Sequence, residues 1–131
     1  MRSLHHGHIS KVRSTALKRK KENNMENKTI SKQIAKIVQL CYQINYEETN
    51  REITGNLPTV FLDFMGHTCQ INIRIYDDGW MSGEDPDFSA HVYLDESPND
   101  VSAELAKLIE RLGVTLKLKA RKERKRNNAE M

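Results

Sequence analysis

The chain has 131 residues, of which 21 are Lys or Arg and 18 are Asp or Glu, giving a formal net charge of +3. This length fits one small domain, because domains commonly contain about 100–150 residues, and it excludes a two-domain enzyme. No stretch approaches the roughly 20 apolar residues that a membrane-spanning helix needs. We therefore expect a protein without membrane contact.

The charge is unevenly distributed. Residues 1–21 contain seven basic residues and no acidic one, residues 22–116 contain seven basic and sixteen acidic residues, and residues 117–131 contain seven basic and two acidic residues. A sequence pI near 8.9 would by itself suggest a polyanionic partner. Because the basic residues concentrate at the two ends, the middle of the chain is acidic. This favours a partner with a basic or mixed protein surface.

Residues 1–24 contain few large apolar residues and show no sustained helical or strand period. This composition predicts that residues 1–24 are a disordered basic leader or a tag remnant, and that Met25 is the native start. A mitochondrial presequence is the alternative, because the segment is basic and contains Ser, but it lacks a clear amphipathic face. Residues 25–131 alone carry 14 basic and 17 acidic residues, a net charge of −3.

The first helix is predicted over 29–46, where apolar residues recur at spacings of three and four. Thr29 or Ser31 fits the N-cap. The residues of this apolar stripe are Ile30, Ile34, Ile37, Val38, Cys41 and Ile44.

Three strands are predicted over 60–65, 68–76 and 88–94. The first two flank Gly66-His67, which fits a two-residue hairpin turn. Isoleucines at 71, 73 and 75 alternate with polar residues, so one face of the sheet is buried and the other is open. Cys69 is predicted on the buried face, whereas the open face is expected to carry Arg74, Tyr76, His91 and Tyr93.

The second helix is predicted to begin at Ser97-Pro98. Ser97 fits the N-cap, Pro98 the first helical position, and Asp100 supplies an acidic residue in the first turn. Gly113 fits the residue that ends it. Alternating residues over 114–118 predict a short fourth strand, with a helix running into the basic segment as the alternative. Residues 119–131 are predicted to be a basic flexible tail.

These elements predict an α+β fold: a two-layer α-β-β-β-α arrangement with a three-stranded antiparallel sheet and both helices on one face, forming a single domain over 25–118. Over about 29–113 the element order resembles that of double-stranded RNA-binding domains. That family clamps phosphates with a lysine-rich start of its second helix. The corresponding residues 97–104 read SPNDVSAE, without lysine, so we infer no membership of that family.

No nucleotide-binding glycine loop and no common hydrolase or metalloprotease motif is present, which disfavours an enzyme and predicts no cofactor. Cys41, His67, Cys69 and His91 are suitable zinc ligands by type. Their spacing is not that of a compact site, and strand parity separates Cys69 from His91. We therefore predict no metal site and two reduced cysteines in a cytoplasmic protein.

The favoured function is that of a small non-enzymatic accessory protein that binds a protein partner through an acidic loop. A short chain rich in Lys, Ile and Asn is typical of phage or mobile-element proteins. Trp80 either folds back on the core, which is the commoner arrangement, or anchors the contact. The candidate residues are Asp77, Asp78, Trp80, Glu84, Asp85 and Asp87.

The alternative function is nucleic-acid binding by the basic C-terminal segment together with the open sheet face, because such runs of cations bind phosphate backbones. A sheet edge is also a candidate contact for a dimer. The basic candidates are Lys117, Lys119, Arg121, Lys122, Arg124, Lys125 and Arg126.

Overall fold

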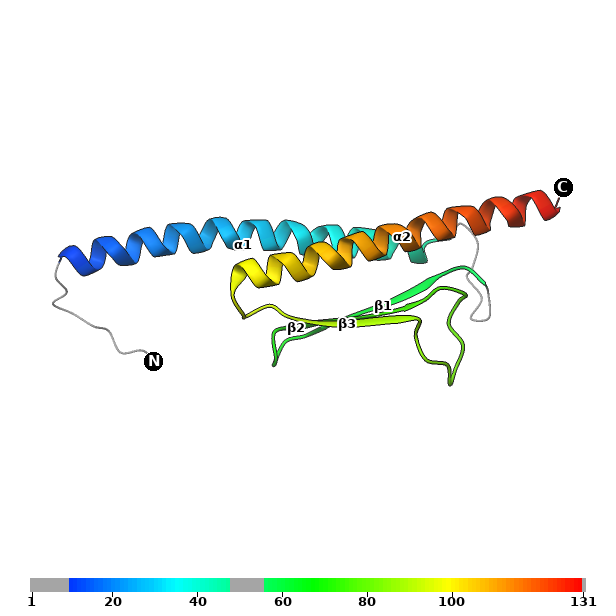
Figure 1. Ribbon diagram of the computed structural model, residues 1–131, viewed down its shortest axis with the longest axis horizontal. Coiled ribbons are helices and arrows are strands. Elements are labelled where there is room, and N and C mark those ends of the chain that lie inside the picture. The colour runs from blue at the N-terminus through cyan, green and yellow to red at the C-terminus, as the bar shows by residue number, and fades with distance from the viewer. Residues whose placement is uncertain (1–9, 48–55, 131) are drawn as a thin grey trace.

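The computed structural model describes residues 10–47 and 56–130, and the side chains within 27–47 and 56–128. Within these residues the elements are, in order, α1 (Ser10–Asn45), β1 (Thr59–Met65), β2 (Gln70–Tyr76), β3 (Phe88–Tyr93) and α2 (Pro98–Glu130). The predicted α+β class and the order α-β-β-β-α are confirmed (Figure 1). No described helix is both long and apolar enough to cross a bilayer.

The three strands form one antiparallel sheet in the order β1-β2-β3. The register places Phe64, Ile71 and Val92 in one row across the sheet, and Asp63, Asn72 and His91 in the next. Ile71, Ile73 and Ile75 are all buried. The predicted alternation of β2 is therefore confirmed, with the isoleucines toward the helices and the polar residues on the open face.

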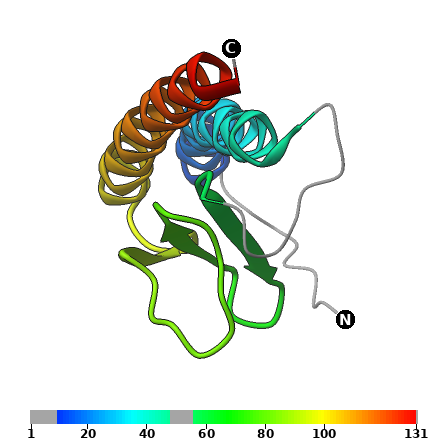
Figure 2. The same cartoon turned by 90° about the vertical axis from the view of Figure 1, so that its right-hand side faces the viewer.

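Both helices lie on one face of the sheet, side by side and running in the same direction (Figures 1 and 2). Near the start of α2, the carbonyl oxygen of Ser102 accepts a hydrogen bond of 3.0 Å from Nε2 of Gln33, which lies in the second half of α1. The apolar residues of each helix that reach the core recur at spacings of three and four, as expected for packed helices. In α1 they include Ile30, Ile37, Cys41 and Ile44, and in α2 Val101, Leu105, Leu108 and Leu112.

The predictions that α2 ends at Gly113 and that a fourth strand covers 114–118 are wrong. Of the predicted flexible tail, 119–131, residues 119–130 are helical and residue 131 lies outside the described residues. The helix continues to Glu130. The reason is that its buried stripe does not stop: Thr115 and Lys119 are buried at the next helical spacings after Leu112. Thr115 fits there because its hydroxyl donates to the carbonyl oxygen of Arg111 at 3.2 Å, which satisfies the buried polar group.

The first helix also begins earlier than predicted. It starts at Ser10 rather than near residue 29, so residues 10–24 are helical where a disordered leader was expected. Between Ser10 and Asn24 there is no Gly or Pro, and Lys, Arg, Ala, Leu and Glu all have good helix propensity. The remaining part of the expected leader, residues 1–9, lies outside the described residues.

The turn between β1 and β2 is longer than the predicted two residues. Met65 pairs with Gln70, so residues 66–69 form the connection. Cys69 closes it with a left-handed backbone, φ 50°, and its N–H donates to the carbonyl oxygen of Gly66 at 3.3 Å. Cys69 therefore belongs to the turn and not to the buried face of β2.

Candidate functional site: acidic loop, basic helix and open sheet face

The acidic loop, residues 77–87, connects β2 to β3 and extends from one end of the sheet on the side away from the helices (Figure 1). Its two ends are held together, because Asp87 Oδ2 accepts a 2.7 Å hydrogen bond from the backbone N–H of Asp77. Gly79 and Gly83 adopt φ values of 91° and 87°, a conformation that favours glycine.

Two of the predicted partner-binding acids turn back toward α2. Asp77 Oδ2 lies 3.3 Å from Arg111 Nη2, and Asp78 Oδ1 lies 2.5 Å from Lys122 Nζ. Lys122 Nζ also donates to the carbonyl oxygens of Asp77 at 2.7 Å and Asn56 at 2.9 Å. The acidic loop and the basic helix, predicted as two separate binding surfaces, therefore partly neutralise each other.

Trp80 folds back on the open face of the sheet. Its ring lies 6.1 Å from that of Phe61, centroid to centroid, and Phe61 in turn lies 5.8 Å from Tyr76 in an edge-to-face arrangement. The guanidinium of Arg74 stands 4.7 Å above the Phe61 ring, a cation–π contact. Tyr76, predicted as an open-face residue, is consequently buried.

The other two open-face candidates lie elsewhere on β3. His91 Nδ1 is 2.6 Å from Asn72 Oδ1, which also accepts a 2.6 Å hydrogen bond from Gln70 Nε2. Tyr93 pairs with Gln70 at the far end of the strand and is exposed. The open face thus holds an aromatic cluster at one end and a polar ladder at the other, and its four candidates do not converge on one site.

Lys119 is the most buried of the seven basic candidates, with 6% of its surface exposed. Its Nζ donates to the carbonyl oxygens of Gln43 at 2.7 Å and Tyr46 at 2.6 Å. Carbonyls at the C-terminal end of a helix lack intrahelical N–H partners and carry partial negative charge. Lys119 therefore caps the end of α1 from a different helix.

Arg126 continues the same face of α2. Its guanidinium lies 3.4 Å from Glu47 Oε1 and 3.4 Å from Asn56 Oδ1. We call Lys119, Lys122 and Arg126 the inner cations, because all three bind acceptors within the fold. Their spacings of three and four continue the buried stripe that passes through Leu112 and Thr115.

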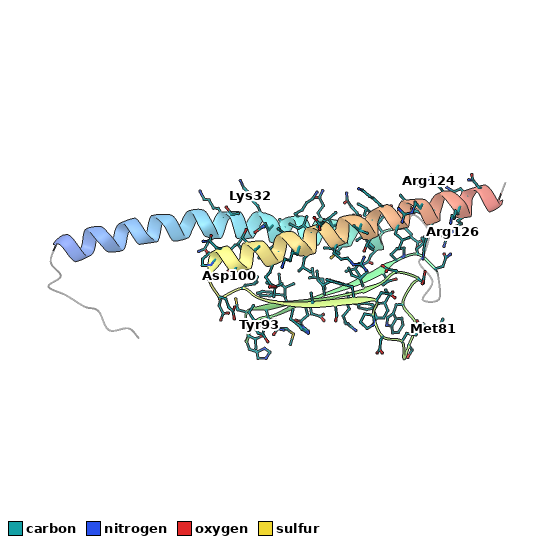
Figure 3. The ribbon with its side chains drawn as sticks, in the orientation of Figure 1. Lys32, Met81, Tyr93, Asp100, Arg124 and Arg126 are labelled. Carbon is teal, nitrogen blue, oxygen red and sulfur yellow. The ribbon has the colours of Figure 1, made fainter. Side chains whose placement is uncertain are left out.

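The remaining four basic candidates form what we call the outer basic face of α2. All four are exposed, and none of their side chains forms an ion pair or hydrogen bond with another residue that the structure describes. At about 100° per residue they project within a sector about 100° wide, opposite Lys119. Figure 3 shows Arg124 pointing away from the sheet and Arg126 toward it. The face consists of Lys117, Arg121, Arg124 and Lys125.

The four residues considered as zinc ligands occupy different places. Cys41 lies in the helix core, His67 and Cys69 lie in the turn at 66–69, and His91 is bonded to Asn72. Burial raises the pKa of the Cys41 thiol from 9.0 to about 11. Over the described parts of the chain, no group of three or more His, Cys, Asp or Glu is placed to hold a metal ion.

Sequence reasoning found all seven basic residues but missed their division into two faces. The signal for this division was the unbroken helical spacing from Leu112 through Thr115, Lys119, Lys122 and Arg126.

Comparison of the chain with protein-family models, with curated proteins and with solved structures finds no match.

Proposed function

We propose that this is a non-enzymatic accessory protein that binds nucleic acid through the outer basic face of α2. The observation that supports the proposal is the division of the basic cluster: the side chains of three cations bind acceptors elsewhere in the fold, whereas those of the other four are exposed on one side of the same helix and bind no described residue. Exposed Lys and Arg on one surface attract phosphate backbones and release their counterions.

The helix sets the spacing of these four cations. Residues 117–125 span about 12 Å along the axis, at about 1.5 Å per residue. That length corresponds to three or four phosphates of one strand, at about 3.4 Å of axial rise each. The face contains no aromatic side chain that stacks on bases, so we expect binding that is insensitive to sequence.

The test is fluorescence anisotropy with a labelled duplex DNA of about 20 base pairs between 50 and 200 mM salt. Four phosphate contacts predict a slope of about −3 to −4 for log K against log salt. Replacing all four residues of the outer basic face by Gln should abolish binding at 50 mM salt.

The matched control replaces four exposed lysines outside that face by Gln, namely Lys28, Lys32, Lys36 and Lys107. Both variants lose the same charge, so only the position of the charge differs between them. Retained binding by the control supports the outer basic face. Equal loss in both variants, or no binding by the parent protein at 50 mM salt, contradicts the proposal.

A second candidate function is protein binding by the acidic loop. It is favoured by the exposed apolar side chain of Met81 on the loop (Figure 3). The same loop carries the exposed acids Glu84, Asp85 and Asp87. Because Asp77, Asp78 and Trp80 have contacts within the fold, the informative changes are Met81→Ser and Glu84→Lys with Asp85→Lys. Loss of a partner that the parent protein retains in pull-down supports this candidate, and undiminished capture contradicts it.

A further inference from the structure

The strand β1 lies at an edge of the sheet. At its start, Asn45 of α1 binds both backbone groups of Val60: the N–H of Val60 donates to Asn45 Oδ1 at 2.9 Å, and Asn45 Nδ2 donates to the carbonyl oxygen of Val60 at 2.8 Å. The backbone groups of Val60 therefore point outward, away from β2. The side-chain amide takes the place that a neighbouring strand would occupy.

Two further residues of β1 present outward backbone groups. In an antiparallel pair, residues alternate between facing the partner strand and facing away from it. Leu62 and Phe64 have the same parity as Val60, so their N–H and C=O groups also point outward. No described residue binds these groups. The edge thus offers two free residues as a template for another strand.

Apolar side chains flank this free edge on the helix side of the sheet. Phe64 is 64% exposed, although the residue opposite it, Ile71, is buried. On α1, Tyr42 and Val38 precede Asn45 by three and seven residues, so they lie on the same side of the helix as Asn45, and both are exposed. A strand added at β1 would direct alternate side chains toward this surface.

Asp63 lies between Leu62 and Phe64, and its exposed side chain is on the open face, opposite Asn72. In an antiparallel pair of two β1 strands, the register that uses both Leu62 and Phe64 places Asp63 directly opposite Asp63 of the second copy. Like charges directly opposite each other destabilise such a pair. The register shifted toward Val60 needs backbone groups that Asn45 already binds. Both registers that pair residues within β1 (Thr59–Met65) are therefore unfavourable for a second copy, and the opposite shift pairs Leu62 with Gly66, beyond the end of β1.

We propose that the β1 edge binds an extended strand of another protein, with a Lys or Arg opposite Asp63 and apolar residues opposite Leu62 and Phe64. The basic residue is selected by the carboxylate of Asp63. The two apolar residues contact Phe64 and the exposed side of α1. Main-chain hydrogen bonds supply affinity in this mode and the alternate side chains supply specificity. The inference is independent of nucleic-acid binding by α2.

The first test compares two synthetic peptides, acetyl-Thr-Ile-Lys-Ile-Thr-amide and its Glu counterpart, by titration against ¹⁵N-labelled protein. The amide signals of Leu62 and Phe64 should shift, and the Lys peptide should bind about two- to tenfold more tightly, as expected for one attractive against one repulsive cross-strand pair. Asp63→Lys should reverse this preference. Asp85→Lys, the same charge change on the exposed loop, should leave it unchanged.

A peptide with both isoleucines N-methylated provides the backbone control, because it cannot donate to Leu62 and Phe64 and should not bind. Unshifted β1 amides with either unmethylated peptide would overturn the proposal, and so would an unchanged preference in Asp63→Lys. Sedimentation gives a second test: Asp63→Asn removes the repulsion and should self-associate more strongly than the parent protein. A parent protein that already dimerises through β1 would show that the occupant is a second copy.

Discussion

The Nζ atom of Lys119 in α2 lies 2.6 Å from the carbonyl oxygen of Tyr46, just beyond the end of α1, although 73 residues separate the two in the chain. The last turn of α1 contains no basic residue of its own. A cation near a helix C-terminus stabilises it by interacting with the free carbonyls. In this fold the cation comes from the neighbouring helix, so the end of α1 depends on α2 continuing past Gly113.

Lys119→Met keeps most of the aliphatic stem of the side chain but removes both hydrogen bonds and the charge. We expect it to lower the free energy of unfolding by about 1.5–3 kcal/mol, the range for hydrogen bonds to a charged group. Urea denaturation followed by circular dichroism measures this change. Lys117→Met, on the exposed side of the same helix, should change it by less than about 0.5 kcal/mol. Equal effects of the two variants would contradict the capping role.

The ion pair between Lys122 and Asp78 should contribute little. The Asp78 side chain is 87% exposed, and exposed pairs contribute about 0–1 kcal/mol and are screened by salt. Asp78→Asn should therefore have a small effect that disappears at 0.5 M salt (about a 4 Å Debye length). Lys122→Met should cost more, because its Nζ also binds the carbonyl oxygens of Asn56 and Asp77. A double-mutant cycle of Lys122 and Asp78, measured by urea denaturation, separates the ion pair from the carbonyl hydrogen bonds of Lys122. A coupling energy above about 2 kcal/mol would contradict the small contribution of the ion pair.

Gly113→Ala should stabilise the protein by about 0.5–1 kcal/mol, because glycine inside a helix loses more backbone entropy on folding than alanine does. A Cβ atom at this position meets no atom within 4 Å. Had Gly113 ended the helix in a left-handed conformation, the same change would destabilise the protein. The direction of the shift in thermal midpoint therefore distinguishes a continuous α2 from a helix that stops at Gly113.

Burial raises the pKa of Cys41 from 9.0 to about 11, so the folded protein retains this proton at a pH where the unfolded chain has lost it. The stabilisation from the neutral buried thiol is complete below pH 9 and is lost as the pH rises from 9 to 11. Denaturation midpoints measured across this range should fall, and Cys41→Ala should show a smaller fall. At pH 8, iodoacetamide should modify Cys69 in the turn well before Cys41 in the core.

The core of the fold was predictable because it depends on local periodicity. The alternation at Ile71, Ile73 and Ile75 indicates one buried face, and the Ser97-Pro98 signal places the start of α2 within one residue of its position. The failed predictions after Gly113 depend on distant partners, whereas the earlier start of α1 agrees with the local helix propensity of residues 10–24. Gly113 and the alternating residues after it favoured a break in the helix, whereas the packing of Thr115 and Lys119 against the rest of the fold keeps it helical.

The candidate site was predictable in composition but not in geometry. Reading along the chain, Asp78 and Lys122 belong to an acidic segment and a basic segment of opposite character, and nothing local indicates that they touch. Likewise, Tyr76 has the alternation of an open-face residue but is buried, with the Phe61 ring of β1 packed against it and Trp80 of the loop packed against Phe61. Such contacts arise from tertiary structure and have no signature in a short window of sequence.

The two roles of the α2 cations are separated only by rotational phase. One residue inserted after Gly113 would turn the following helix by about 100° relative to α1. Leu118 would then occupy the position of Lys119 against the carbonyls of α1, and Lys119 itself would face solvent. Surface charge and helix capping would change in a single step, with the amino-acid composition of the basic segment unaltered. Substitutions on the outer basic face should therefore leave the fold intact, whereas an insertion or deletion between Gly113 and Lys119 should destabilise it.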